Sequence, residues 1–291
     1  MGTMISIDKA ELEKDIVFTL KNSLPSEYKP LYNDQPQLHD WYELFFVKAG
    51  EVSWFIENEM HPIAPYTLTI FNSQEIHKLH IRSNKRFERM KLLFNPALAR
   101  QFSINGFDPL ACFDERPKGK GNIVALSMQE GQELQDLFKK VAAEDDRPET
   151  PLSRLIALMD ILILANRLYR NSPARSEAPA LPDKVADVMA YVSEHLGDDL
   201  SLEAISSALG INRFYLCRIF KKETGSTLHN YILYKRISEA KKLLHDGIKT
   251  SQVCAMCGFG SMARFAASFR NIVGQTPAAY AKSPADSGAR S

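Results

Sequence analysis

Two cysteines, Cys254 and Cys257, have a spacing that can support chemistry. The same spacing occurs in thioredoxin-like redox sites and in one half of many zinc sites. A redox pair would open a helix at the end of a strand, and no strand is expected before these residues. A zinc site would need two further ligands, and the neighbouring sequence offers only His245. We therefore expect both cysteines to be small buried residues in the core of a helical unit.

A second group of residues with ligand chemistry lies nearer the N-terminus, at Gln37, His39 and Glu43, with His77 farther along. The first three positions differ by even numbers, so they share one face of a strand. Two imidazoles and a carboxylate can bind iron, manganese or zinc. They can equally hydrogen-bond a small polar ligand, or form a buried structural His–Glu pair. All three interpretations stay open at the level of the sequence.

The segments that must position this second group predict a β-domain. Short runs rich in β-branched and aromatic residues alternate with turn signals, at residues 41–48, 51–57, 66–71 and 86–94. Evenly spaced short strands of this kind predict an antiparallel barrel or sandwich. Tyr42 and Trp54 lie in these runs and could provide an aromatic wall for a sugar or an aromatic ring. The two-residue period, however, places Tyr42 on the face opposite Glu43.

After residue 125 the apolar period becomes helical, at residues 127–144 and 151–170. The second helix is apolar around most of its circumference, so it must be covered on more than one side, either by the same chain or by a second subunit. Residues 171–182 contain three prolines and have the composition of a linker. The predicted division is a domain at 1–170, a linker at 171–182, a second domain at 183–282 and a disordered tail at 283–291.

The C-terminal third repeats itself, because residues 201–232 align with residues 250–281. Each copy predicts a short helix, a turn containing glycine (Gly210 or Gly258) and a second helix, which is a helix-turn-helix unit. An amphipathic helix at 228–247 connects the two units. Residues 183–282 contain 13 Lys and Arg against 9 Asp and Glu, whereas the whole chain has a net charge of +1. A basic, duplicated helix-turn-helix segment is typical of a domain that binds a polyanion such as DNA.

These features resemble the DNA-binding domain of AraC/XylS transcription regulators. The resemblance rests on ALGINRFYLCRIFKKETG, on YKRISEAKKLL and on CGF…F…F…GQTPAAY. In that family the outward residues of both recognition helices enter successive major grooves. On the first helix the implied DNA contacts are Asn212, Arg213, Phe214, Cys217, Arg218, Lys221 and Lys222. Of these, Phe214, Cys217 and Arg218 face the bases, whereas Arg213, Lys221 and Lys222 are expected to contact phosphates.

The second recognition helix departs from the family pattern. Its implied contacts are Ser261, Met262, Ala263, Arg264, Ala266, Ala267 and Arg270. The base-facing side chains among them, Met262 and the three alanines, lack hydrogen-bond donors, so they could contact thymine methyl groups but discriminate bases weakly. We expect Arg264 and Arg270 to hold the DNA backbone.

The N-terminal segment resembles the cupin-like β-barrel that regulators of this family often carry. Gln37 occupies the first histidine position of the cupin metal motif, and His39, Glu43 and His77 occupy the other three. The expected fold is therefore α+β with two domains, a cupin-like antiparallel β-barrel followed by helices and then an all-α domain with two helix-turn-helix units. A metal at His39, Glu43 and His77 is the less favoured interpretation, and no cofactor is expected.

The resemblance implies an effector-responsive, sequence-specific DNA-binding regulator without catalytic activity. Its implied partners are double-stranded DNA, a small-molecule effector such as a sugar or an aromatic compound, a second copy of the chain and RNA polymerase. With four scattered cysteines and no apolar run long enough for a bilayer, the chain is expected in the cytoplasm, away from membranes. The alternatives are a cupin-type metalloenzyme, such as a dioxygenase or an isomerase, and an oligomeric scaffold that does not bind nucleic acid.

Overall fold

The strands predicted between residues 39 and 94 form two antiparallel sheets in the computed structural model, which describes residues 14–23, 35–81, 86–143, 147–172 and 181–282. The strands are β1 (Ile16–Ser23), β2 (Tyr42–Ala49), β3 (Val52–Ile56), β4 (Glu59–Ile63), β5 (Thr67–Phe71), β6 (His77–Ile81), β7 (Phe87–Phe94) and β8 (Ile123–Ala125). The larger sheet has the order β1-β7-β2-β5-β8, and the smaller sheet has the order β4-β3-β6.

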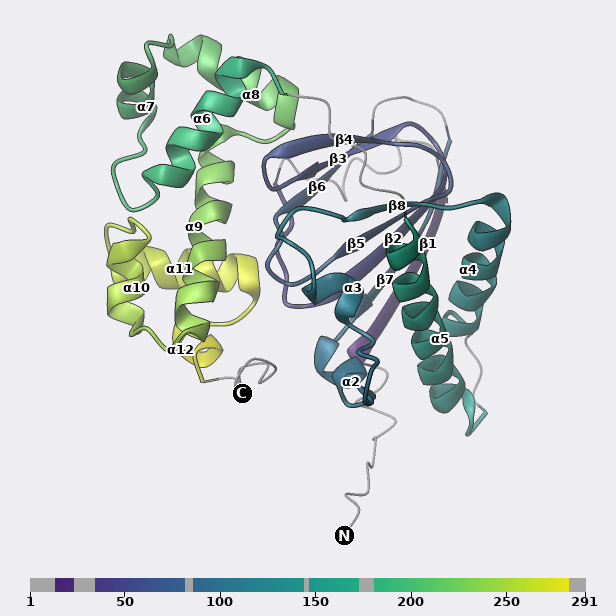
Figure 1. Cartoon of the computed structure of the whole chain (residues 1–291). Helices are drawn as coiled ribbons and strands as arrows, with labels where there is room; N and C mark the ends of the chain where they lie inside the picture. The colour runs from purple at the N-terminus through teal and green to yellow at the C-terminus, as the bar shows by residue number, and fades with distance from the viewer. Residues whose placement is uncertain (1–13, 24–34, 82–85, 144–146, 173–180, 283–291) are drawn as a thin grey trace.

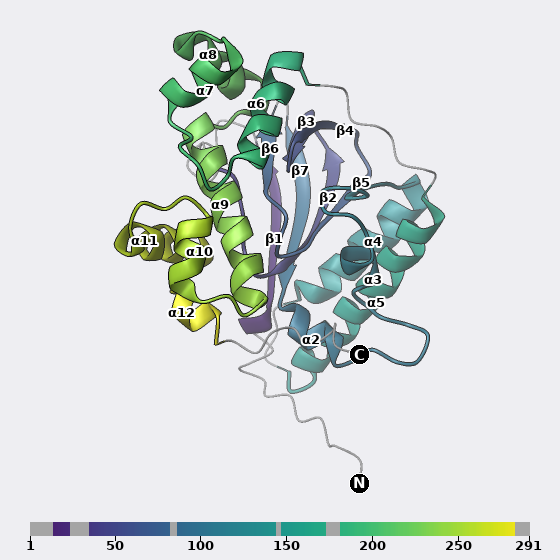
Figure 2. The same cartoon turned by 60° about the vertical axis from the view of Figure 1, so that its left-hand side comes forward.

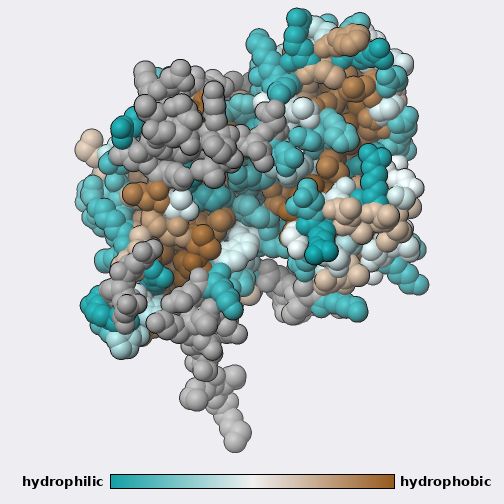
Figure 3. All heavy atoms as spheres, turned by 180° about the vertical axis from the view of Figure 1, so that it is seen from behind, coloured by the Kyte–Doolittle hydropathy of each residue, from teal (hydrophilic) through white to brown (hydrophobic). Residues whose placement is uncertain are grey.

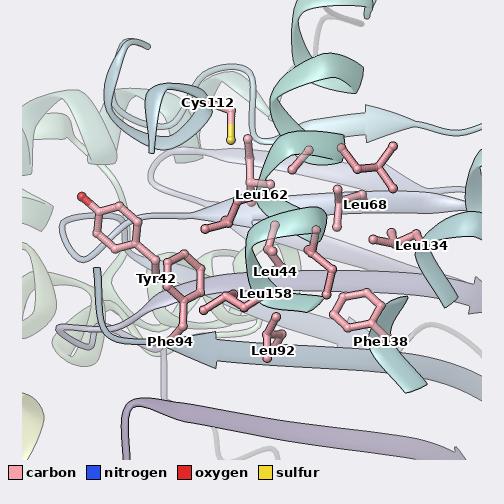
Figure 4. Close-up of a cluster of buried hydrophobic side chains, with 14 of the residues drawn as sticks. Tyr42, Leu44, Leu68, Leu92, Phe94, Cys112, Leu134, Phe138, Leu158 and Leu162 are labelled. Atoms are coloured by element: carbon pink, nitrogen blue, oxygen red, sulfur yellow. The ribbon is translucent and has the colours of Figure 1, made fainter. Parts of the chain in front are cut away.

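Alternation along the strands gives the larger sheet two buried faces. One face carries Leu44, Leu68 and Leu92 and is covered by α4 (Met128–Val141) and α5 (Thr150–Asn171), as Figure 4 shows. The other face carries Phe45 and Phe71, which pack against Trp54 and Leu79 of the smaller sheet. The two sheets therefore enclose an interior of their own, separate from the layer under the helices. We call residues 14–172 the β domain, which also contains the short helices α2 (Pro96–Arg100) and α3 (Ala111–Asp114).

Residues 181–282 form the helical domain, in which α9 (Leu228–His245) runs between two units (Figures 1 and 2). The first unit contains α6 (Asp183–Glu194), α7 (Leu202–Leu209) and α8 (Arg213–Thr224). The second contains α10 (Thr250–Met256), α11 (Met262–Val273) and α12 (Pro277–Tyr280). Gly210 and Gly258 adopt positive φ, of 63° and 68°, just past the ends of α7 and α10. The predicted helix-turn-helix duplication and the two-domain α+β fold are therefore confirmed.

The surface seen from behind is mostly hydrophilic, with hydrophobic patches on both domains (Figure 3). Among the described residues no helix is both long enough and apolar enough to cross a bilayer. Most of the predicted linker at 171–182 and all of the predicted tail at 283–291 lie outside the described residues, so these boundaries stay predictions.

Candidate nucleic-acid interface and ligand site

The first recognition helix, α8, is held by a cap at each end. The side chain of Asn212 accepts hydrogen bonds from the backbone amides of Phe214 and Tyr215, and Gly225 ends the helix with φ 65°. Leu216 and Phe220 are buried against the rest of the unit. The inward face of α8 is therefore occupied by packing, which leaves the opposite face for a partner.

That opposite face carries the predicted contacts. Phe214 is 72% exposed, and Arg213, Arg218, Lys221 and Lys222 are exposed as well, whereas Cys217 is half-buried. The guanidinium of Arg213 lies 4.9 Å from the ring centroid of Phe214 and pairs with Glu203 at 3.0 Å. Arg218 has no carboxylate partner in the part of the chain that the structure describes. Its donors are therefore available to an external acceptor.

The second recognition helix, α11, presents a different face. The side chain of Ser261 accepts a hydrogen bond from the backbone amide of Arg264, and Phe265 and Phe269 are buried. Most of the predicted contacts on the outer face are exposed, namely Met262, Ala263, Arg264, Ala267 and Arg270. Ala266 on the same face is half-buried. Arginine is the only hydrogen-bonding side chain among them, so this helix offers little chemistry for distinguishing bases.

The two cysteines of the Cys-x-x-Cys motif belong to the core of the second unit, as predicted. Cys254 is 5% exposed and Cys257 is fully buried, packed with Val253, Phe259 and Phe265. Both thiols are free. Burial raises the pKa of Cys257 to about 12, so its thiol stays protonated at neutral pH and lacks the thiolate that redox or metal chemistry requires.

In the β domain the predicted His–Glu group comes together around one carboxylate oxygen. Oε2 of Glu43 lies 3.1 Å from Nε2 of His39 and 3.7 Å from Nε2 of His77. The same oxygen lies 2.7 Å from the ammonium of Lys91 on β7. Glu43 and His77 are fully buried, whereas the side chain of His39 is 24% exposed. The site therefore lies at an opening of the interior between the two sheets.

The hydrogen bonds of the two histidines fix which ring nitrogen faces Glu43. Nδ1 of His39 donates to the carbonyl of Trp41 at 2.9 Å, and Nδ1 of His77 donates to the carbonyl of Glu75 at 3.0 Å. Both Nε2 atoms therefore face Glu43. Burial lowers the pKa of His39, against the opposing effect of Glu43. Burial alone would raise the pKa of Glu43, but Lys91 and the histidines outweigh it and hold that pKa well below its usual range.

The three side chains of the cluster match a metal-binding site in part. The ligand atoms of His39, Glu43 and His77 lie within 4.8 Å of one another. Nδ1–carbonyl hydrogen bonds like those made here also orient histidines that bind metals. The Lys91 ammonium, however, lies 2.7 Å from Oε2 of Glu43 and already balances the charge of the carboxylate. A resident divalent ion at this carboxylate would lie beside that ammonium, so the site does not suit one.

The other predicted ligand-site residues divide between two places. Trp54 belongs to the cluster, since its ring lies 5.7 Å from that of His77 and 4.9 Å from that of Phe45. Gln37 adjoins the cluster through its backbone, which pairs with His77. Tyr42 does not line the site. It faces the helix side of β2, packs on Phe94 (Figure 4) and donates to a carboxylate oxygen of Asp114, because adjacent residues of a strand point to opposite faces.

Two cations of the site were missed from the sequence. Lys91 and Arg89 lie on β7, which pairs with β2 in the register Phe45↔Lys91 and Val47↔Arg89. Arg89 is only 6% exposed, and its guanidinium carbon lies 5.1 Å from the ring centroid of Phe45. The signal that could have revealed them is the two-residue spacing of Arg89 and Lys91 in FERMKLLF, which puts both cations on one face of the strand.

The strand that carries His77 also holds the end of α8. Lys78 and His80 of β6 lie on the face of the strand opposite His77, and both contact the helical domain. Nε2 of His80 donates to the carbonyl of Thr224 at 2.7 Å, and the Lys78 ammonium donates to the carbonyl of Gly225. A Cβ at Gly225 would lie 1.6 Å from the His80 ring, so this approach requires glycine. The end of a recognition helix thus rests on a strand of the ligand site.

The segment that carries His39 and the loop that leads into His77 also contact α9. Asp40 pairs with Lys241 at 2.7 Å, and Lys241 donates to the carbonyl of Ser73 at 2.6 Å. Ser238 donates to the carbonyl of Gln74 at 3.1 Å. Apolar contacts accompany these bonds, because Leu38 and Ile76 belong to the core cluster that contains Tyr234 and Ile237 of α9.

Comparison with known families agrees with this arrangement of two domains. The model of the AraC-like ligand binding domain matches residues 25–162, and the model of a helix-turn-helix domain matches residues 205–283. The chain is 25% identical over 223 residues to the uncharacterized HTH-type transcriptional regulator YbfI of Bacillus subtilis, covering 76% of this chain and 77% of that protein. It is 23% identical over 242 residues to the HTH-type transcriptional activator RhaS of Salmonella schwarzengrund, covering 82% and 84%.

A third relative, the regulatory protein PocR of Salmonella typhimurium, is 30% identical over 170 residues, and the match covers 52% of this chain and 54% of that protein. Among solved structures, apo ToxT of Vibrio cholerae matches 92% of this chain and 97% of its own at 14% identity and a TM-score of 0.38. The DNA-binding domain of AdpA in complex with a target DNA matches 33% of this chain and 87% of its own, at 30% identity and a TM-score of 0.32. The chain belongs to the AraC/XylS family of transcriptional regulators, with a ligand-binding domain followed by a helix-turn-helix DNA-binding domain.

Proposed function

We propose that this regulator couples a small-molecule effector in the interior of the β domain to the grip of that domain on α8 and α9. One observation carries the proposal. His39 and His77 belong to short segments whose neighbouring residues, Asp40 and Lys78, contact the helical domain. A ligand that shifts either histidine would therefore shift a residue that holds α8, a recognition helix, or α9, the helix between the two units. The β domain contacts the helical domain directly, so no third domain is needed to transmit the shift.

The two recognition helices have unequal roles in this proposal, as they enter successive major grooves. Arg218 of α8 reads a guanine through its O6 and N7 atoms, while Arg213, Lys221 and Lys222 contact phosphates. The exposed ring of Phe214 contacts a thymine methyl group. The alanine-rich face of α11 adds little base discrimination, and Arg264 and Arg270 hold the DNA backbone there. The sequence preference of the complex should therefore be concentrated under α8.

A homodimer would bring two such domains to paired half-sites. The support is an apolar stripe on α5, where Leu152, Ile156 and Ile163 are 59%, 53% and 49% exposed. The spacing of these residues places them on one face of the helix, turned away from the sheet. Contiguous exposed apolar residues of this kind mark association surfaces. RNA polymerase is a further partner that such a role allows, and a DNA partner places the protein in the bacterial cytoplasm.

Selection of genomic fragments by the purified full-length chain tests this function. We expect enrichment of fragments that share a motif in two half-sites, with affinity that falls steeply as salt rises. The neighbouring genes would then suggest the effector. Equal recovery of enriched and random fragments would refute sequence-specific recognition, and binding insensitive to salt would refute the phosphate contacts.

The second candidate function is a cupin-type metalloenzyme, favoured only by the convergence of His39, Glu43 and His77. Against it, Lys91 already neutralises Glu43, and the named relatives are transcriptional regulators. We propose that the chain has no catalytic activity and needs no cofactor. Elemental analysis of the purified protein decides between the two, since stoichiometric iron, manganese or zinc that is lost in His77→Ala would favour the enzyme.

A further inference from the structure

The interior of the β domain holds a cation that no carboxylate of the described residues neutralises. Arg89 is 6% exposed, and its Nε and Nη1 atoms have no hydrogen-bond partner. Its neighbour Lys91 differs, because that ammonium pairs with Glu43 at 2.7 Å. Lys91 therefore already balances the charge of Glu43, and the described residues of the interior leave the positive charge of Arg89 unmatched.

The surroundings of Arg89 do not explain its burial. Among the described residues its guanidinium lies over the ring of Phe45, 5.1 Å from the centroid. Burying an ionised group without a counter-charge is costly, and a cation–aromatic contact offsets only part of that cost. An anionic ligand would supply the missing counter-charge, so a buried cation of this kind is a candidate binding group for one.

Other unpartnered groups surround the same aromatic side chains. The indole Nε1 of Trp54 is buried without an acceptor, and the Trp54 ring lies 4.9 Å from Phe45. Oε1 of Glu43 is buried without a donor. The walls between these polar atoms are the rings of Phe45, Trp54 and Phe71. A ligand that satisfies the two donors, Arg89 and Trp54, offers them oxygen atoms and presents a flat or branched apolar body to the aromatic rings.

We propose that the effector is a small organic carboxylate whose charged group is bound by Arg89 and whose apolar body lies against Phe45 and Trp54. The assignment rests on the proposed function, because it names the chemical class of that effector. It also predicts that a compound of the same shape without the charge does not bind. The neutral amide of the same acid keeps the shape and loses the charge, so it should not bind.

The test compares benzoate and isobutyrate with benzamide and isobutyramide on the full-length chain, at constant ionic strength. At a concentration one hundred times its Kd, an acid should raise the Tm of the wild type by about 5–10 °C. Neither amide should do so, and Arg89→Met should abolish the response. Lys48→Met, a half-exposed cation on the neighbouring strand β2 that pairs with Glu88 at the surface, should keep it. Failure of both acids, equal shifts with acids and amides, or an unchanged response in Arg89→Met would overturn the assignment.

A second measurement needs no ligand. If Arg89 is kept for a ligand, Arg89→Met removes an unmatched buried charge and its Tm without ligand should equal or exceed that of the wild type. A Tm lower by more than about 5 °C would show that Arg89 supports the fold and would overturn the proposal. DNA binding separates the two hypotheses. A wild type that responds to acids and selects no DNA motif refutes the regulatory function alone, whereas motif selection with no preference for acids refutes the carboxylate site alone.

Discussion

The ammonium of Lys241 lies 2.7 Å from Oδ1 of Asp40, which joins the helix between the two helix-turn-helix units to the segment that carries His39. The Lys241 side chain is 2% exposed, and burial lowers its pKa while Asp40 opposes that shift. The same ammonium donates to the carbonyl of Ser73, in the segment that leads to His77. One buried cation therefore ties both histidine-bearing segments to α9.

Lys241→Met should loosen this contact between the domains while keeping the apolar stem of the side chain. Because Asp40 is partly exposed and can be hydrated, we expect the free energy of unfolding to fall by only about 1–3 kcal/mol. Amide hydrogen exchange at residues 38–40, 73–77 and 234–244 should become faster. Lys242→Met, an exposed neighbour, should leave exchange in these segments unchanged. Unchanged exchange in Lys241→Met would mean that apolar packing alone holds the domains together.

Arg218→Ala should cost about 1–3 kcal/mol of affinity for the selected site and relax the preference at one base pair, because a base contact is lost. Lys222→Ala should weaken selected and random DNA about equally, because a phosphate contact carries no sequence information. Titrations of both variants on both DNAs, by fluorescence anisotropy, give the comparison. An equal loss on the two DNAs in Arg218→Ala would reassign that arginine to the phosphate backbone.

Ile156→Asp should convert the proposed dimer into a monomer, because it places a charge in the apolar stripe of α5. Met128→Asp is the matched control, since Met128 is 73% exposed on α4 and lies outside the stripe. Sedimentation equilibrium of the two variants measures the assembly state. A wild type that is already monomeric at micromolar concentration, or an Ile156→Asp variant that stays dimeric, would show that the stripe is not a dimer interface.

His39 should make folding stability depend on pH below about 6.5, the ordinary pKa of histidine. Burial lowers the folded-state pKa of His39 from its ordinary value of 6.5, so below that value the unfolded chain binds more protons than the folded chain. Stability is therefore full above pH 6.5 and falls as the pH falls toward the folded pKa. His61, whose pKa burial also lowers, acts in the same direction. The contribution of Glu43 is lost only below about pH 4.5.

His39→Asn removes this titration. As the pH falls below 6.5 the variant should lose less stability than the wild type, as measured by urea unfolding. His229→Asn, at an exposed histidine of α9, should follow the wild type. Parallel pH profiles for His39→Asn and the wild type would show that His39 has the same pKa in both states.

The helical domain could be predicted from the sequence because its signals are local. Glycines with positive φ after α7 and α10, capping side chains before α8 and α11, and apolar residues at helical spacing each act within one or two turns. The duplication repeated these signals, and the core position of Cys257 followed from its alignment with Leu209. The two-residue period likewise predicted that Tyr42 and Glu43 face opposite sides of β2.

Which strands become neighbours was decided only by the tertiary structure. The period of a strand fixes the face of each side chain but not the partner strand or the register, so the approach of Lys91 to Glu43 and of Arg89 to Phe45 followed only from the pairing of β2 with β7. The contact of Asp40 with Lys241 depends on how the two domains dock. Such contacts arise from the shape and charge of complete surfaces, and no local pattern in either segment encodes them.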